Sequence, residues 1–123
     1  GDERFRHFRK TFGYANMPLD GLWLRGPYLH NGSVPTVRDL LEPPELRPAT
    51  FYRGDDVVDR ERLGFRSDVA GAGTREFFRV DTRLREGADP RERNAGNGNG
   101  GHLYGTDLPP QDKDALVEYL KTF

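Results

Sequence analysis

The chain has 123 residues, of which 34% are hydrophobic and 32% charged, and its 19 basic and 20 acidic side chains leave a net charge of −1. This balance excludes a general attraction to nucleic acid, and no apolar run approaches the ~18 residues of a membrane span. The absence of cysteine excludes disulfide bonds, zinc–thiolate sites and a cysteine nucleophile. We therefore expect one domain with neither a nucleic-acid partner nor a transmembrane segment.

The N-terminal part of the chain predicts a short helix followed by irregular, apolar chain. Phe5, Phe8 and Phe12 recur at steps of three and four, the spacing of one helix face. Between residues 13 and 33, glycine and proline disfavour regular helix. That segment nevertheless carries many large apolar side chains, so we expect it to pack against a large apolar surface. These side chains are Tyr14, Met17, Leu19, Leu22, Trp23, Leu24, Tyr28 and Leu29.

The middle of the chain predicts a second short helix and then extended structure. Ser33 or Val34 begins this helix, and Pro43–Pro44 ends it. Beyond residue 45, strand-like composition alternates with glycine. The predicted strands are Thr50–Arg53, Asp56–Val58 and Glu76–Asp81, which would form a hairpin or small sheet.

The C-terminal part predicts a polar linker and a final helix. Residues 85–101 contain almost nothing apolar, which is typical of disordered chain. A helix is expected from about Pro110 to Thr122, with Asp112 in its first turn and Lys121 in its last. Its apolar stripe consists of Leu116, Val117, Leu120 and Phe123.

Few residues in the chain are candidates for catalysis or metal binding. The common nucleophile, phosphate-loop and zinc-protease motifs are missing from the sequence. Met17 is either a thioether ligand for iron or core filler. His30 lies in a tight polar turn, and His102 ends a glycine-rich loop that lets backbone lie close to a flat ligand. From residue types alone, each histidine is either a ligand or an ordinary structural residue.

The end of the chain resembles the C-terminal segment of c-type cytochromes. Tyr104-Gly105-Thr106 and Leu108-Pro109-Pro110 lead into a helix that matches the family pattern L-x-x-Y-L-K. In that family the loop before this helix carries the distal iron ligand, usually Met. The resemblance therefore implies that His102 is an axial iron ligand in a bis-histidine site.

A longer string resembles the C-terminal haem domain of bacterial di-haem cytochromes. Leu19-Asp20-Gly21-Leu22-Trp23 is followed by the string PYLHNGSVPT over residues 27–36. The superfamily includes the di-haem cytochrome c peroxidases, the MauG-like enzymes and the rubber oxygenases. The resemblance covers about residues 13–54 and 94–123.

The resemblance implies a fold that is mainly α, with much irregular loop and a few short strands, in a cytochrome c-like haem domain. The whole chain, 1–123, would be one partial domain. Residues 13–54 would form a haem-pocket segment, 55–93 a strand and loop insertion, and 94–123 the axial-ligand loop and last helix. Haem c would be the cofactor, bordered by Trp23, Tyr28, Leu29, His30 and Leu108.

The chain lacks the Cys-x-x-Cys-His motif by which this family attaches haem. The attachment site would then lie upstream or on a partner chain, unless the chain is a degenerate relative without haem. The function implied is electron transfer to a redox partner protein, in the periplasm or otherwise outside the cytoplasm. Two alternatives stay open: the electron-storing domain of a di-haem peroxidase or oxygenase, and a haem-free structural or interaction module. Whether the whole protein is an enzyme is therefore left open.

Overall fold

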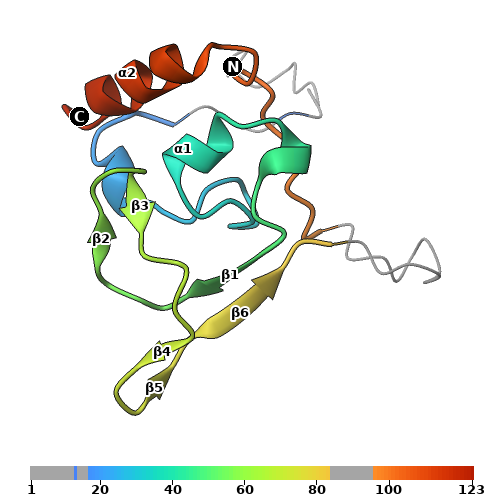
Figure 1. The fold of residues 1–123 in the computed structure, drawn as a ribbon, viewed down its shortest axis with the longest axis vertical. Helices are drawn as coiled ribbons and strands as arrows, with labels where there is room; N and C mark the ends of the chain where they lie inside the picture. Colours follow the sequence, from blue (N-terminus) through green and yellow to red (C-terminus); the bar gives the residue numbers. More distant parts are fainter. Residues whose placement is uncertain (1–12, 14–16, 84–95) are drawn as a thin grey trace, which may run out of the picture.

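A computed structural model describes residues 13, 17–83 and 96–123 (Figure 1). The predicted helix through Phe5, Phe8 and Phe12 lies outside these residues, as do residues 85–95 of the predicted linker. The elements, in chain order, are η2 (Leu22–Leu24), α1 (Val37–Leu40), η3 (Pro44–Leu46), β1 (Thr50–Arg53), β2 (Val58–Asp59), β3 (Gly64–Phe65), β4 (Gly71–Ala72), β5 (Arg75–Glu76), β6 (Phe78–Asp81) and α2 (Pro110–Leu120).

The prediction of a mainly α fold is wrong. Within the described ranges, α2 is the one helix longer than a single turn, and six short strands form three antiparallel pairs. The pairs are β1–β6, β2–β3 and β4–β5. Proline and glycine explain the difference, because they interrupt the chain so often that helices cannot extend between residues 17 and 83.

The helix predicted from Ser33 or Val34 begins later, as α1. Val34 instead forms an antiparallel bridge with Tyr28, through hydrogen bonds of 2.7 and 3.3 Å between their main chains. Thr36 then caps α1, because its side chain accepts a hydrogen bond from the amide of Asp39 at 3.1 Å. Polar capping thus sets the start of this short helix.

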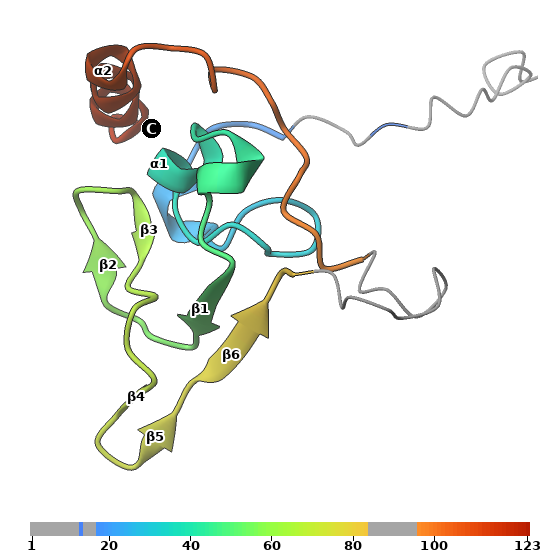
Figure 2. The same ribbon diagram turned by 45° about the vertical axis from the view of Figure 1, so that its right-hand side comes forward.

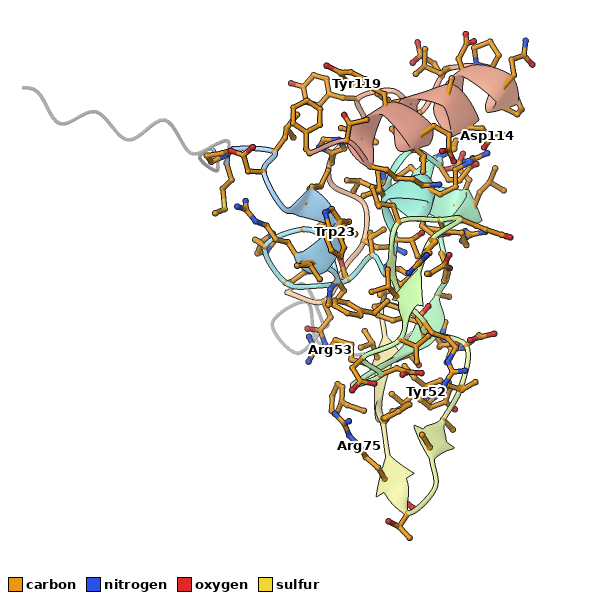
Figure 3. All side chains as sticks on the ribbon, turned by 90° about the vertical axis from the view of Figure 1, so that its left-hand side faces the viewer. Trp23, Tyr52, Arg53, Arg75, Asp114 and Tyr119 are labelled. Atoms are coloured by element: carbon orange, nitrogen blue, oxygen red, sulfur yellow. The ribbon has the colours of Figure 1, made fainter. Side chains whose placement is uncertain are left out.

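The strands place a hairpin at the end of the molecule opposite α2 (Figure 1). The predicted strand Thr50–Arg53 is confirmed as β1, which pairs with β6 in the register Phe51 to Val80. Side chains alternate along β1, so Tyr52 and Arg53 point to opposite sides of the ribbon in Figure 3. The β4–β5 pair extends beyond this sheet (Figure 1).

The core lies between α1 and α2. The predicted C-terminal helix is confirmed as α2, and its Val117 is buried against α1 and the 28–34 bridge. The buried members of this core are Tyr28, Val34, Val37, Leu41, Leu63 and Val117. Figure 2 shows residues 96–109 descending from α2 past α1 to the turn around residue 30. No helix within the described ranges is long and apolar enough to cross a bilayer.

Candidate functional site

Two of the histidines lie on one cleft of about 760 Å³. Its lining includes His30 and His102 together with the apolar side chains of Leu22, Leu29 and Leu40. We call this the histidine cleft. The fold thus brings together two imidazoles that are far apart in the sequence.

A tight turn positions His30 at the cleft. The Tyr28–Val34 bridge closes the turn, and within it the amide of Gly32 donates to the carbonyl of Leu29 at 3.1 Å. Leu29 and Gly32 have φ angles of 67° and 64°, in the left-handed region that favours glycine. The Tyr28 hydroxyl donates to the carbonyl of Leu22 at 2.9 Å, which ties the turn to η2. Local backbone geometry therefore fixes the place of His30.

The loop that carries His102 is hydrogen-bonded to the same turn. The Asn31 amide donates to the carbonyls of Gly96 and Gly98 at 2.6 and 3.0 Å. The Ser33 hydroxyl adds a bond of 3.0 Å to the carbonyl of Gly98. Within the string HNGS, His30 thus lines the cleft, while Asn31 and Ser33 bind the opposite loop.

The imidazole of His102 suits a metal ligand at neutral pH. Burial lowers its pKa below the ordinary value, and the positive charge of Arg47 lowers the pKa further. This shift favours the neutral ring, whose nitrogen lone pair can coordinate a metal. His102 also makes an edge contact with Tyr104, whose ring centre lies 5.5 Å away.

The other predicted site residues divide into two groups. Tyr28 and Leu29 line the histidine cleft with His30 and His102. Trp23, which is labelled in Figure 3, instead lines a separate pocket with Leu63 and Lys121. Leu108 lies near Gly105, two residues before the start of α2. A role for Trp23 or Leu108 beside a ligand stays a prediction.

Apolar side chains at the cleft mouth are exposed. Met17 and Tyr104 both line the cleft and are 71% and 82% exposed. Exposed apolar surface that gathers at a concave site is typical of a ligand or partner surface. Met17 is therefore not core filler in the described part of the chain, and a ligand role for its thioether stays a prediction.

The residues of the cleft fit a haem. Its lining is largely apolar and includes two imidazoles, and Arg25 adds a cationic side chain. Within the described ranges, no group of three or more His, Asp or Glu side chains is arranged to hold a metal ion. A porphyrin needs one or two protein ligands rather than such a group.

Arg47 belongs to the same site, although the sequence analysis did not single it out. Its guanidinium donates to the main-chain carbonyl of His102 at 2.7 Å and to that of Gly101 at 2.6 Å. No local pattern links this arginine to the loop, because Gly101 and His102 lie more than fifty positions away along the chain.

Residues 13–52 match the family of RoxA-like, cytochrome c-like domains. This segment contains the PYLHNGSVPT string, so the match supports a cytochrome c-like domain, a class of domain that suggests haem c. The attachment of that haem outside the chain is not tested by the match and stays a prediction.

Two curated relatives come from Sinorhizobium fredii. The uncharacterized protein y4iJ is 42% identical over 118 residues, which cover 89% of this chain and 17% of the relative. The uncharacterized protein y4iM is 39% identical over 124 residues, which cover 89% of this chain and 27% of the relative. The chain thus spans between a sixth and about a quarter of the length of these relatives. No solved structure matches it.

Proposed function

We propose that this chain is the distal part of a c-type haem domain that transfers electrons, with His102 as an axial iron ligand. The observation that carries the proposal is the histidine cleft, whose largely apolar lining includes the imidazoles of His30 and His102. The match of residues 13–52 to RoxA-like, cytochrome c-like domains supports it independently. A bound haem c would supply one-electron redox chemistry at this site.

The chain's own residues would bind and shield this group. His102 offers a nitrogen for the axial position, while Leu29 and Tyr28 exclude water from one wall. Arg25 offers positive charge to the carboxylates that a porphyrin carries. With a second imidazole supplied by a Cys-x-x-Cys-His motif upstream or on a partner chain, no coordination position is left for substrate. Such a site favours electron transfer, outside the cytoplasm where haem c is attached.

The family match also favours a second candidate function. Rubber oxygenases and di-haem peroxidases combine an electron-storing haem with a reactive one, and the matched family is RoxA-like. In such a protein this chain would belong to the electron-storing domain. Turnover of peroxide or of an oxygenase substrate by the complete protein would distinguish this enzyme from a pure electron carrier.

The test is the absorption and electron paramagnetic resonance spectrum of the complete protein, compared with His102→Ala and His30→Ala. We expect His102→Ala to convert low-spin iron to high-spin iron and His30→Ala to retain the low-spin signal. Unchanged low-spin bands in His102→Ala would refute the ligand assignment, and loss of these bands only in His30→Ala would move the assignment to His30. A complete protein without any haem would support the haem-free module instead.

A further inference from the structure

Arg47 is a buried arginine whose hydrogen bonds all go to the main chain. Arg47 is only 4% exposed to solvent. Its Nε donates to the carbonyl of Glu42 at 2.9 Å, and Nη2 donates to those of Leu40 and His102 at 3.1 and 2.7 Å. Its Nη1 donates to the carbonyls of Asn99 and Gly101. A guanidinium has five N–H donors, so five carbonyls use them all.

These five carbonyls come from two segments of the chain. Leu40 ends α1 and Glu42 follows it by two residues, whereas Asn99, Gly101 and His102 belong to the loop at the histidine cleft. The guanidinium therefore joins the loop to the helical part of the core. Because its donors form a rigid, planar fork, a single arginine can fix both segments at once.

The hydrogen-bond partners of Arg47 indicate that its role is to hold the backbone in place rather than to form an ion pair. Buried cations are usually compensated by carboxylates, yet the hydrogen-bond acceptors of Arg47 are neutral carbonyls. Asp39 and Glu45 act on it only through space. The site thus keeps a desolvated cation in order to hold backbone in place.

The loop needs such an anchor because its own residues pack weakly. Gly96, Gly98 and Gly100 have nothing within 4 Å of the position where a Cβ would lie. At its end, His102 has a φ of 58°, which is unfavourable for a residue with a side chain. Arg47 donates to the carbonyl of this same residue. The guanidinium therefore stabilises the backbone conformation that directs His102 to the cleft.

We infer that Arg47 is a positioning residue that holds the 99–102 loop so that the imidazole of His102 stays at the iron-binding position. This inference rests on the proposed function, in which His102 is the axial ligand. Lysine cannot replace arginine here, because an ammonium has three donors at one point and cannot reach both segments with the same geometry.

The experiment compares Arg47→Lys with the matched control Arg66→Lys in the complete protein. Arg66 donates through Nε to the Asp55 carboxylate at 2.6 Å, on the β2–β3 side of the molecule. The first readout is the rate of chymotrypsin cleavage after Leu103 and Tyr104, both of which are exposed. The second readout is the high-spin fraction of the iron, with and without added imidazole.

We expect Arg47→Lys to be cleaved about tenfold faster than wild type, since local opening requires fewer hydrogen bonds to break. We also expect it to show a high-spin fraction that added imidazole converts back to low-spin. Arg66→Lys should resemble wild type in both readouts. Positive results in both readouts for Arg47→Lys alone would support the inference.

Three results would overturn it. The first is wild-type cleavage and spectrum in Arg47→Lys, the second is faster cleavage with an unchanged spectrum, and the third is the same change in Arg66→Lys. His102→Ala separates these failures from failure of the proposed function. If His102→Ala alters the spectrum and Arg47→Lys does not, only the positioning role is wrong; if neither alters it, the ligand assignment itself is wrong.

Discussion

Neutralising Glu42 should loosen α2 more than removing the buried charge of Lys113. Lys113 lies on α2 and is only 5% exposed, and its Nζ lies 3.1 Å from a carboxylate oxygen of Glu42. Arg38 on α1 also pairs with Glu42, and its Nε donates to Asp114 of α2 at 2.8 Å. Figure 3 shows Asp114 on the side of α2 nearest α1. Glu42 is thus the acceptor shared by both cations.

The burial of Glu42 and of Lys113 determines how much each substitution, Glu42→Gln or Lys113→Met, lowers the stability of α2. Breaking a buried ion pair costs about 3–5 kcal/mol, because one charge is left without a partner. In Glu42→Gln the ammonium of Lys113 keeps only an amide oxygen, but the side chain of Glu42 is 22% exposed and water offsets part of the loss. We therefore expect a cost of about 2–3 kcal/mol. Lys113→Met leaves Glu42 paired with Arg38, so about 1 kcal/mol is expected.

The loss of stability caused by Glu42→Gln should depend on pH. Burial by itself would raise the pKa of Glu42, but hydrogen bonds from Arg38 and Lys113 outweigh it, and the pKa lies below its ordinary value of 4.5. A carboxyl with a lowered pKa in the folded state stabilises that state above 4.5 and loses this effect as the pH falls through the folded-state pKa. The difference between wild type and Glu42→Gln should therefore shrink in acid.

Native-state hydrogen exchange of the α2 amides in the complete protein measures this local free energy. Glu118→Gln is the matched control, because Glu118 also pairs with a lysine, Lys121, but its side chain is 70% exposed. It should cost less than about 0.5 kcal/mol. The reasoning is refuted if Lys113→Met costs as much as Glu42→Gln, or if Glu118→Gln costs as much as either.

Two further predictions concern the core around the 28–34 turn. Gly64→Ala should lower the thermal unfolding temperature, because the new Cβ would lie 2.7 Å from the carbonyl oxygen of Pro35. We expect this substitution to lower stability by about 1–3 kcal/mol. An unchanged unfolding temperature would contradict the close packing around Gly64. Burial raises the pKa of Tyr28 to about 12. Tyr28 therefore ionises near pH 10 in the unfolded chain but stays protonated in the folded chain. Stability should fall as the pH rises from 10 to 12. Tyr28→Phe should abolish that fall and cost about 1 kcal/mol at pH 7 through loss of the bond to Leu22; ionisation of Tyr28 near pH 10 in a spectroscopic titration would contradict this.

Elements with local signals could be predicted from the sequence. The proline at the start of α2, the acid in its first turn and its apolar spacing lie within a few residues of one another, and α2 forms where they place it. The apolar, β-branched and aromatic composition of Thr50–Arg53 likewise predicted β1. The start of α1 was missed because the side chain of Thr36 and the Tyr28–Val34 bridge compete with a longer helix.

The histidine cleft shows the same division. The string PYLHNGSVPT and the glycine-rich loop before Tyr104 marked His30 and His102 as candidates in the sequence. Their meeting at one cleft depends on bonds from Asn31 and Ser33 to the distant loop. Trp23 had an equally suggestive position in the sequence, yet it lies in another pocket.

The sequence by itself determined the composition limits, the final helix, one strand and the two candidate imidazoles, because each depends on residue types within a short window. Only the tertiary structure decided the strand pairs, the separation of Trp23 from the cleft and the hydrogen bonds of Arg47. The physical reason is that the five carbonyls around this guanidinium come from segments on either side of the strands, and bonds to the main chain leave no pattern of side chains for the sequence to display.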